Sequence, residues 1–169
     1  MFGWGRPLIG STESEPRQRA SNRRRSVARL AAVQAIYQLE ANPEADPTAV
    51  VREFSRHRFG EEIDGDRLEA ADPALFDDIV HGVSADQERL DAEISAALTD
   101  DWPLQRLDAV LRAILRAGAY ELVHRRDVPP RITLKEYTVI AHAFFTGKEP
   151  GLANGVLNRL AHTLRPADL

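Results

Sequence analysis

Four arginines gathered within seven residues are the strongest chemical feature of this sequence. Arg23, Arg24 and Arg25 follow one another, and Arg29 comes four positions after Arg25. Guanidinium groups bind phosphate oxygens in pairs and stack on nucleobases, so such a run is suited to RNA. Because residues four apart share one face of a helix, we expect Arg25 and Arg29 to form a common basic face. The alternative is a solvated run of charge that only aids solubility.

The arginines stand at the start of a predicted helix over residues 21–40. Ser21 or Asn22 is suited to the N-cap, and apolar residues recur there at a spacing of three to four. A helix N-terminus offers free N–H groups and a positive dipole end, which both favour an anion. Cations at this end cost about 0.3–1 kcal/mol. A chain that accepts this cost is expected to bind an anionic ligand.

Charge is divided along the chain. Residues 1–31 carry a net charge of +5, residues 40–101 of −13 and residues 102–169 of +4, within a total of −4. This division favours one basic arm that faces a polyanion, with an acidic middle that discourages unspecific coating of nucleic acid. The chain has no cysteine, no apolar run of membrane length and no secretory signal. We therefore expect a cytoplasmic protein with no membrane partner.

The remaining pattern predicts helices and no strand. Residues 1–20, with their glycines and prolines, predict a flexible tail, and residues 21–169 predict one helical domain. Asp46-Pro47 and Asp72-Pro73 each join a cap residue to a proline suited to the first helical turn. Short loops favour antiparallel neighbours, so the fold class is expected to be all-α, a bundle of six to seven helices.

Three boundaries depend on weaker patterns. One apolar stripe runs over residues 76–98, which predicts a single long helix bent around Gly82. Asp101 is expected to cap the next helix, and Thr133-x-x-Glu136 has the form of a capping box for a later one.

The other polar clusters do not form a consistent catalytic or metal site. The acidic stretch 61–66 lacks the ligand spacing of a calcium loop. Asp77 and Asp78 diverge by about 100° on a helix, and the five histidines are scattered without an i, i+4 pair. There is no glycine-rich phosphate loop and no hydrolase motif. We therefore expect no enzyme, no metal ion and no cofactor.

Two glycines inside predicted helices need an explanation, because each costs about 1 kcal/mol relative to alanine. At Gly118 and Gly155 we expect a close approach of another helix, or else of a ligand. Asn154 precedes the second glycine. Its side chain is expected either to bond within the core or to reach a ligand.

Four stretches together resemble one known family. The arginine run and the residues after it, Arg23–Tyr37, are similar to the first helix of the NusB transcription antitermination factors. Three further stretches resemble the same family in the same order, namely Phe76–Val83, Leu111–Leu122 with the following Asp127-Val-Pro, and Asn154–Ala161. The resemblance covers the chain from Arg23 to about Leu164.

The resemblance implies a NusB-like fold of two three-helix subdomains. It also implies binding of boxA RNA from ribosomal RNA leaders, jointly with the ribosomal protein NusE, within an RNA polymerase antitermination complex. Carried over to this chain, the RNA contacts of the family fall on Arg23, Arg24, Arg25 and Arg29. We expect the second part of the RNA site near Asn154. A homodimer that hides the arginine helix, as in some relatives, is left open.

The chain departs from the family pattern at two places. Lys135 stands where the family commonly has Asn in Ile-Asn-Glu-Ala, while Glu136 is kept. Leu152-Ala153 replaces an apolar pair that often contains Phe. Two other functions are weighed against antitermination: an RNA-binding domain related to ribosomal RNA methyltransferases, and an RNA-independent protein adaptor.

Overall fold

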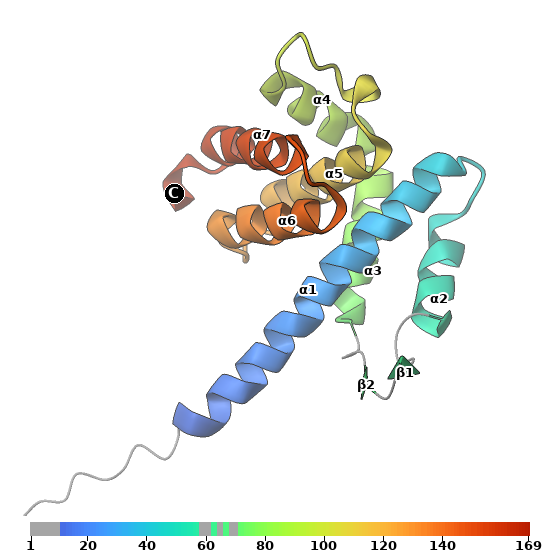
Figure 1. The fold of residues 1–169 in the computed structure, drawn as a ribbon, viewed down its shortest axis with the longest axis vertical. Helices are drawn as coiled ribbons and strands as arrows, with labels where there is room; N and C mark the ends of the chain where they lie inside the picture. Colours follow the sequence, from blue (N-terminus) through green and yellow to red (C-terminus); the bar gives the residue numbers. More distant parts are fainter. Residues whose placement is uncertain (1–10, 58–61, 64–65, 68–70) are drawn as a thin grey trace, which may run out of the picture.

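A first helix much longer than the others, α1 (Ser11–Ala41), runs across one side of the molecule (Figure 1). The computed structural model describes residues 11–57, 62–63, 66–67 and 71–169. The further α-helices in these ranges are α2 (Pro47–His57), α3 (Pro73–Ala85), α4 (Gln87–Ala97), α5 (Ala109–His124), α6 (Pro130–Phe144) and α7 (Glu149–Leu164). Two short 3₁₀ turns, η1 (Leu104–Arg106) and η2 (Pro166–Asp168), complete the helical part.

The helices form two groups of three. Helices α1, α2 and α3 contact one another, as do α5, α6 and α7, while α4 packs on α5 and α7. Helix α5 also contacts α1 and α3, and its residues 113–122 are all buried. The all-α class and the two three-helix groups are thereby confirmed. Within the described ranges, no helix has the length and apolar character to cross a membrane.

The cap residues at the start of α2 and α3 act as predicted. Asp46 Oδ1 accepts a hydrogen bond of 3.1 Å from the Thr48 N–H. Asp72 Oδ1 accepts from the N–H groups of Ala74 and Leu75, both at 3.1 Å. Each carboxylate satisfies N–H groups that the first turn of a helix leaves without a partner.

The structure differs from the sequence prediction at the start of α1. The helix begins at Ser11, ten residues before the expected cap, and residues 14–19 are exposed. Side chains four apart support this extension: Gln18 Nε2 donates to Asn22 Oδ1 at 3.0 Å, and Arg19 lies 3.6 Å from Glu15. Figure 1 shows these first turns extending away from the other helices. The flexible tail stays a prediction for residues 1–10, which lie outside the described residues.

The long helix expected to bend at Gly82 is two helices that meet at Asp86. Gly82 remains inside α3 for another reason, which is the ring of Tyr120 on α5. A Cβ atom at Gly82 would lie 2.1 Å from Tyr120 Cε2, so only glycine fits there. The break follows at Asp86, whose carboxylate lies 2.8 Å from His124 Nε2.

Two other predicted boundaries are wrong. Helix α5 begins after Asp108, whose Oδ1 accepts from the Val110 N–H at 2.8 Å, and not after Asp101. Helix α6 begins at Pro130, because a proline in the first turn loses no helical hydrogen bond. The capping box at Thr133 is therefore not formed.

The acidic stretch 61–66 lies partly outside the described residues. Its described part contributes to a short antiparallel pair that the sequence did not predict, with β1 (Glu62–Ile63) beside β2 (Asp66–Arg67).

The two helix glycines have different surroundings. A Cβ atom at Gly118 would lie 2.8 Å from Leu157 Cδ2, so this glycine allows the close approach of α5 and α7 that we expected. A Cβ atom at Gly155 would meet nothing within 4 Å. The expectation of a close approach at Gly155 is therefore wrong.

Candidate nucleic-acid interface

The three consecutive arginines lie exposed where α1 leaves the body of the fold. Arg23, Arg24 and Arg25 are all exposed on this helix. The Asp72 N–H donates a 3.0 Å hydrogen bond to the Arg24 carbonyl oxygen, which ties the start of α3 to the backbone of the run. Among the described residues, no carboxylate pairs with Arg24 or Arg25. Their guanidinium groups are therefore available for an anionic ligand.

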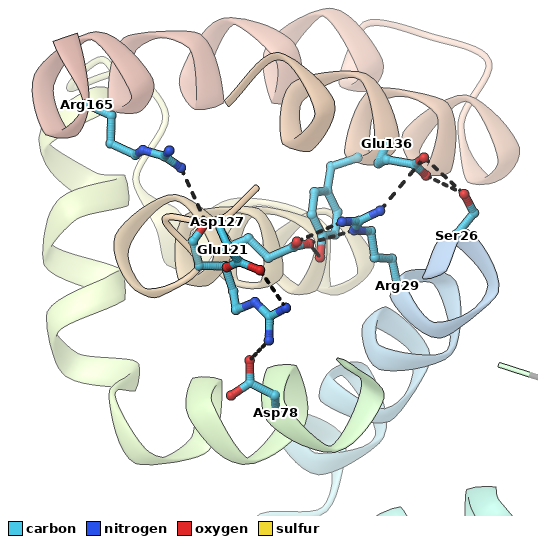
Figure 2. Close-up of polar contacts among 9 residues, drawn as sticks. Ser26, Arg29, Asp78, Glu121, Asp127, Glu136 and Arg165 are labelled. Carbon is cyan, nitrogen blue, oxygen red and sulfur yellow. Dashed lines mark hydrogen bonds and ion pairs between the residues drawn. The ribbon is translucent and has the colours of Figure 1, made fainter. Parts of the chain in front are cut away.

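Arg29 lies in the core, which corrects the prediction that it shares an exposed face with Arg25. Its side chain is 3% exposed, and that of Glu121 on α5 is 0% exposed. Arg29 Nε and Nη2 donate to the two carboxylate oxygens of Glu121 at 2.9 Å and 3.0 Å (Figure 2). The Tyr137 hydroxyl on α6 donates to the same carboxylate. The prediction failed because Arg29, although four residues from Arg25, lies among the buried residues of α1.

The electrostatics of this cluster keep Arg29 charged. Burial alone would lower the pKa of Arg29, but the hydrogen bonds and negative charge of Glu121 outweigh it and raise that pKa. Burial, followed by the charge of Glu121 and the hydrogen bond to it, raises the pKa of Tyr137 well above its ordinary value. At neutral pH Arg29 is thus charged and the Tyr137 phenol neutral, both held inside the protein.

A second contact ties α1 to α6 one turn closer to the arginine run. Ser26 Oγ lies 3.0 Å and 2.9 Å from the two carboxylate oxygens of Glu136, to which it donates (Figure 2). Arg29 Nη1 lies 3.8 Å from the same carboxylate. Together with the Arg29–Glu121 pair, this contact fixes α1 against α5 and α6 immediately after the exposed arginines. We name Ser26, Arg29, Glu121, Glu136 and Tyr137 the clamp.

Asn154 is exposed on α7, and its Nδ2 donates to Thr138 Oγ1 at 3.1 Å. Thr138 follows Glu136 by two residues on α6, which is about 200° around that helix. Since Glu136 faces α1, Thr138 and Asn154 face another side. The structure therefore does not bring Asn154 together with the arginine run.

The connection between α5 and α6 lies beside the arginine run, and two arginines hold it in place through hydrogen bonds. Arg125 donates to Asp78 at 3.2 Å and to Asp127 at 3.1 Å. Arg165, buried at the end of α7, donates to the carbonyl oxygens of Val128 at 2.8 Å and of Arg126 at 3.1 Å. The spacing of residues along the chain did not predict this network. A charged residue just after the last apolar stripe was the one available indication.

The remaining polar groups in the described part of the chain form no arrangement of three or more His, Cys, Asp or Glu that suits a metal ion. What the geometry provides is a fixed helix end with exposed guanidinium groups. Such a site binds and orients a polyanion through charge-assisted hydrogen bonds. It defines a class, namely helical proteins that bind nucleic acid through one basic helix.

Comparison with known proteins gives the family. The NusB family model matches residues 26–162, and the chain belongs to the NusB family. A transcription antitermination protein NusB of Nitrobacter hamburgensis is 50% identical over 145 residues, which cover 86% of this chain and 90% of that protein. The NusB of Agrobacterium fabrum is 48% identical over 156 residues, 92% of this chain and 93% of its own length.

Two solved structures have the same fold. A T. maritima NusB structure matches with a TM-score of 0.70 and 27% identity, covering 85% of this chain and 94% of that one. A structure of the antitermination factors NusB and NusE in complex with dsRNA matches with a TM-score of 0.69 and 21% identity, covering 83% of this chain and 98% of that one.

Proposed function

We propose that this protein is a cytoplasmic transcription antitermination factor that binds boxA-containing RNA of ribosomal RNA leaders together with NusE and has no catalytic step of its own. The observation that carries the proposal is the exposed run Arg23, Arg24 and Arg25 on a helix end fixed by the clamp. The curated NusB relatives and the NusB–NusE–dsRNA structure support it. The protein acts within the RNA polymerase antitermination complex.

The RNA surface consists of the arginine run without Arg29. Exposed guanidinium groups on successive residues of one turn point in several directions, so they follow a phosphate backbone rather than one phosphate. The contact of Asn154 with RNA, expected from the sequence, stays a prediction. Asn154→Ala tests it separately, and a loss of affinity in that variant would extend the RNA surface onto α7.

We propose that the protein partner binds on the same helix, about three turns further along. Tyr37 on α1 and Phe144 on α6 are large apolar side chains that are 43% and 41% exposed. They line one cavity of about 490 Å³, to which Phe54 of α2 and Val110 of α5 also contribute. A ribosomal protein bound there would lie beside RNA held by the arginine run, which explains joint binding.

The central experiment measures binding of a fluorescent boxA RNA by anisotropy, with and without NusE, over a range of salt concentrations. Arg24→Ala/Arg25→Ala should weaken binding at least about tenfold, since two charge-assisted contacts are lost. The slope of log affinity against log salt should fall by about 0.7 for each lost contact with a single strand. Unchanged affinity and slope would refute the assignment of the arginines.

Matched controls separate this effect from a general loss of charge. Arg89→Ala/Arg106→Ala removes the same charge from exposed residues on α4 and η1 and should leave affinity within about twofold. Tyr37→Ser with Phe144→Ser should abolish the gain in affinity from NusE while RNA binding alone persists. Co-purification of a ribosomal protein without any RNA binding would instead favour the adaptor, and binding of S-adenosylmethionine in calorimetry would favour the methyltransferase-related domain.

A further inference from the structure

A cavity with mixed lining opens directly beside the arginine run. It has a volume of about 490 Å³ and lies between α1, the start of α3, and the α5–α6 connection with the first turns of α6. Arg25 from α1 and Lys135 from α6 belong to its lining, so the cavity and the proposed RNA surface share a residue. Its size falls within the range of small-ligand sites in proteins.

The lining includes apolar surface of the kind that accepts a flat ring. Leu75 from α3, Ile132 from α6 and Pro129 belong to the lining. Apolar side chains cover the faces of an unstacked base, which water would otherwise contact. A phosphate gains nothing from such a surface.

Most charges in the wall are already neutralised by protein partners. Arg29 is paired with Glu121, and Arg125 with Asp78 and Asp127. Arg25 and Lys135 differ, since none of the residues in the described ranges pairs a carboxylate with either of them. These two cations are therefore the groups that remain for an anion at the cavity.

Three carboxylates belong to the wall, and that of Asp127 is already paired with Arg125. The other two determine which part of a nucleotide enters. Asp72 caps α3 through one oxygen, and Glu136 accepts from Ser26. An ionised carboxylate has about four acceptor positions, so both keep capacity for further N–H donors. They repel a phosphate group and attract an exocyclic amino group. A nucleotide is therefore oriented with its base inside and its phosphate outside, against the two cations.

We propose that this cavity receives one unstacked nucleobase of the bound RNA, a base with an exocyclic amino group, while the adjoining phosphate lies against Arg25 and Lys135. The proposal rests on the proposed RNA-binding function and adds a base-specific site to it. The phosphate contact from α6 comes from Lys135, which is exposed and belongs to the cavity lining. The cavity therefore prefers cytosine, adenine or guanine, which have an exocyclic amino group, to uracil, which has none.

The first test fills the cavity. A series of boxA RNAs, each with one nucleotide made abasic, is titrated against the full-length protein and Ile132→Trp by fluorescence anisotropy. One abasic position should cost the wild-type protein about tenfold in affinity, as expected for one base stack with its hydrogen bonds. In Ile132→Trp that position should no longer matter, and the salt dependence should stay as in the wild type.

A matched control adds a tryptophan elsewhere. Thr163→Trp on the exposed side of α7 lies outside the cavity, so it should keep the wild-type ranking of the abasic RNAs. If Ile132→Trp fails to fold, as judged by circular dichroism, Glu136→Leu provides a second variant, because leucine has no acceptor oxygen. At the sensitive position, removing the exocyclic amino group should cost the wild-type protein about tenfold and cost Glu136→Leu less than about twofold.

The outcomes distinguish the cavity from the RNA function as a whole. If no abasic position depends on Ile132 or Glu136 while Arg24→Ala/Arg25→Ala still loses RNA, the base site is wrong and the proposed function stands. If the double arginine variant binds as the wild type does, the RNA function itself is wrong. A sensitive position that prefers uracil would also overturn the proposal, since uracil has no amino group.

Discussion

Replacing Arg29 by methionine should destabilise the protein without removing an RNA contact. The substitution leaves the Glu121 carboxylate, which is 0% exposed, with the Tyr137 hydroxyl but without its guanidinium. Breaking a buried ion pair by removing one partner costs about 3–5 kcal/mol. For a protein of this size, each kcal/mol lowers the Tm by about 2–4 °C, so we expect a loss of roughly 10 °C.

The double variant Arg29→Met/Glu121→Leu tests whether the lost stability comes from the unpaired carboxylate of Glu121. It removes both charges, so the uncompensated carboxylate no longer exists, and replacement of a buried pair by apolar residues is often near neutral. The Tyr137 hydroxyl then lacks its acceptor, which costs about 1–3 kcal/mol. The double variant should therefore recover at least half of the stability lost by Arg29→Met.

Urea unfolding at neutral pH, followed by far-UV circular dichroism, measures these differences. RNA affinity is measured in parallel at a temperature where Arg29→Met is folded. It should fall by less than the tenfold expected for Arg24→Ala/Arg25→Ala, and its salt slope should stay as in the wild type, because Arg29 fixes α1 but contacts no phosphate. One combination refutes the reasoning: an Arg29→Met protein that unfolds at the wild-type urea concentration but loses RNA binding. That result would place Arg29 on the RNA surface.

Three further substitutions follow from contacts in the core. Gly118→Ala should destabilise the protein by about 1–3 kcal/mol in urea unfolding, because its Cβ atom would meet Leu157 at 2.8 Å in a filled core. Gly155→Ala, with nothing within 4 Å, should stabilise it by about 0.5–1 kcal/mol in the same assay through helix propensity. Tyr137→Phe should flatten the fall of stability at alkaline pH. Since the pKa of Tyr137 is raised in the folded state, its contribution is complete below pH about 10 and is lost as pH rises toward the folded pKa. Unfolding curves at stepped pH would contradict this if both proteins lost stability alike.

The features that the sequence predicted well are local ones. Asp46 and Asp72 cap their helices through N–H groups only two or three residues away, so a short stretch contains all the information. The existence of the helices follows from the spacing of their apolar residues in the same way. The exposed arginine run is also local, because no distant segment among the described residues buries it.

The features that the sequence predicted poorly depend on distant partners. Arg29 and Glu121 are separated by 92 residues, and the chain gives no spacing rule for such a pair. The phase of α1 did contain an indication: Val33 and Ile36, four and seven residues after Arg29, are buried, so Arg29 continues their stripe. The role of Gly82 was predicted wrongly for the same reason, because the ring that packs against it belongs to Tyr120 on another helix.

The clamp explains how an exposed helix end supports recognition. The turns of α1 before the arginine run are exposed, so the direction of the run is set by the contacts that follow it. Apolar contacts alone would allow α1 to slide or rotate, whereas a guanidinium held by two oxygens of Glu121 permits one register. The Ser26–Glu136 contact then fixes the rotation one turn nearer the run. The buried Arg29 thus fixes the direction of the exposed run of three arginines. A fixed arrangement of cations loses less entropy when RNA binds.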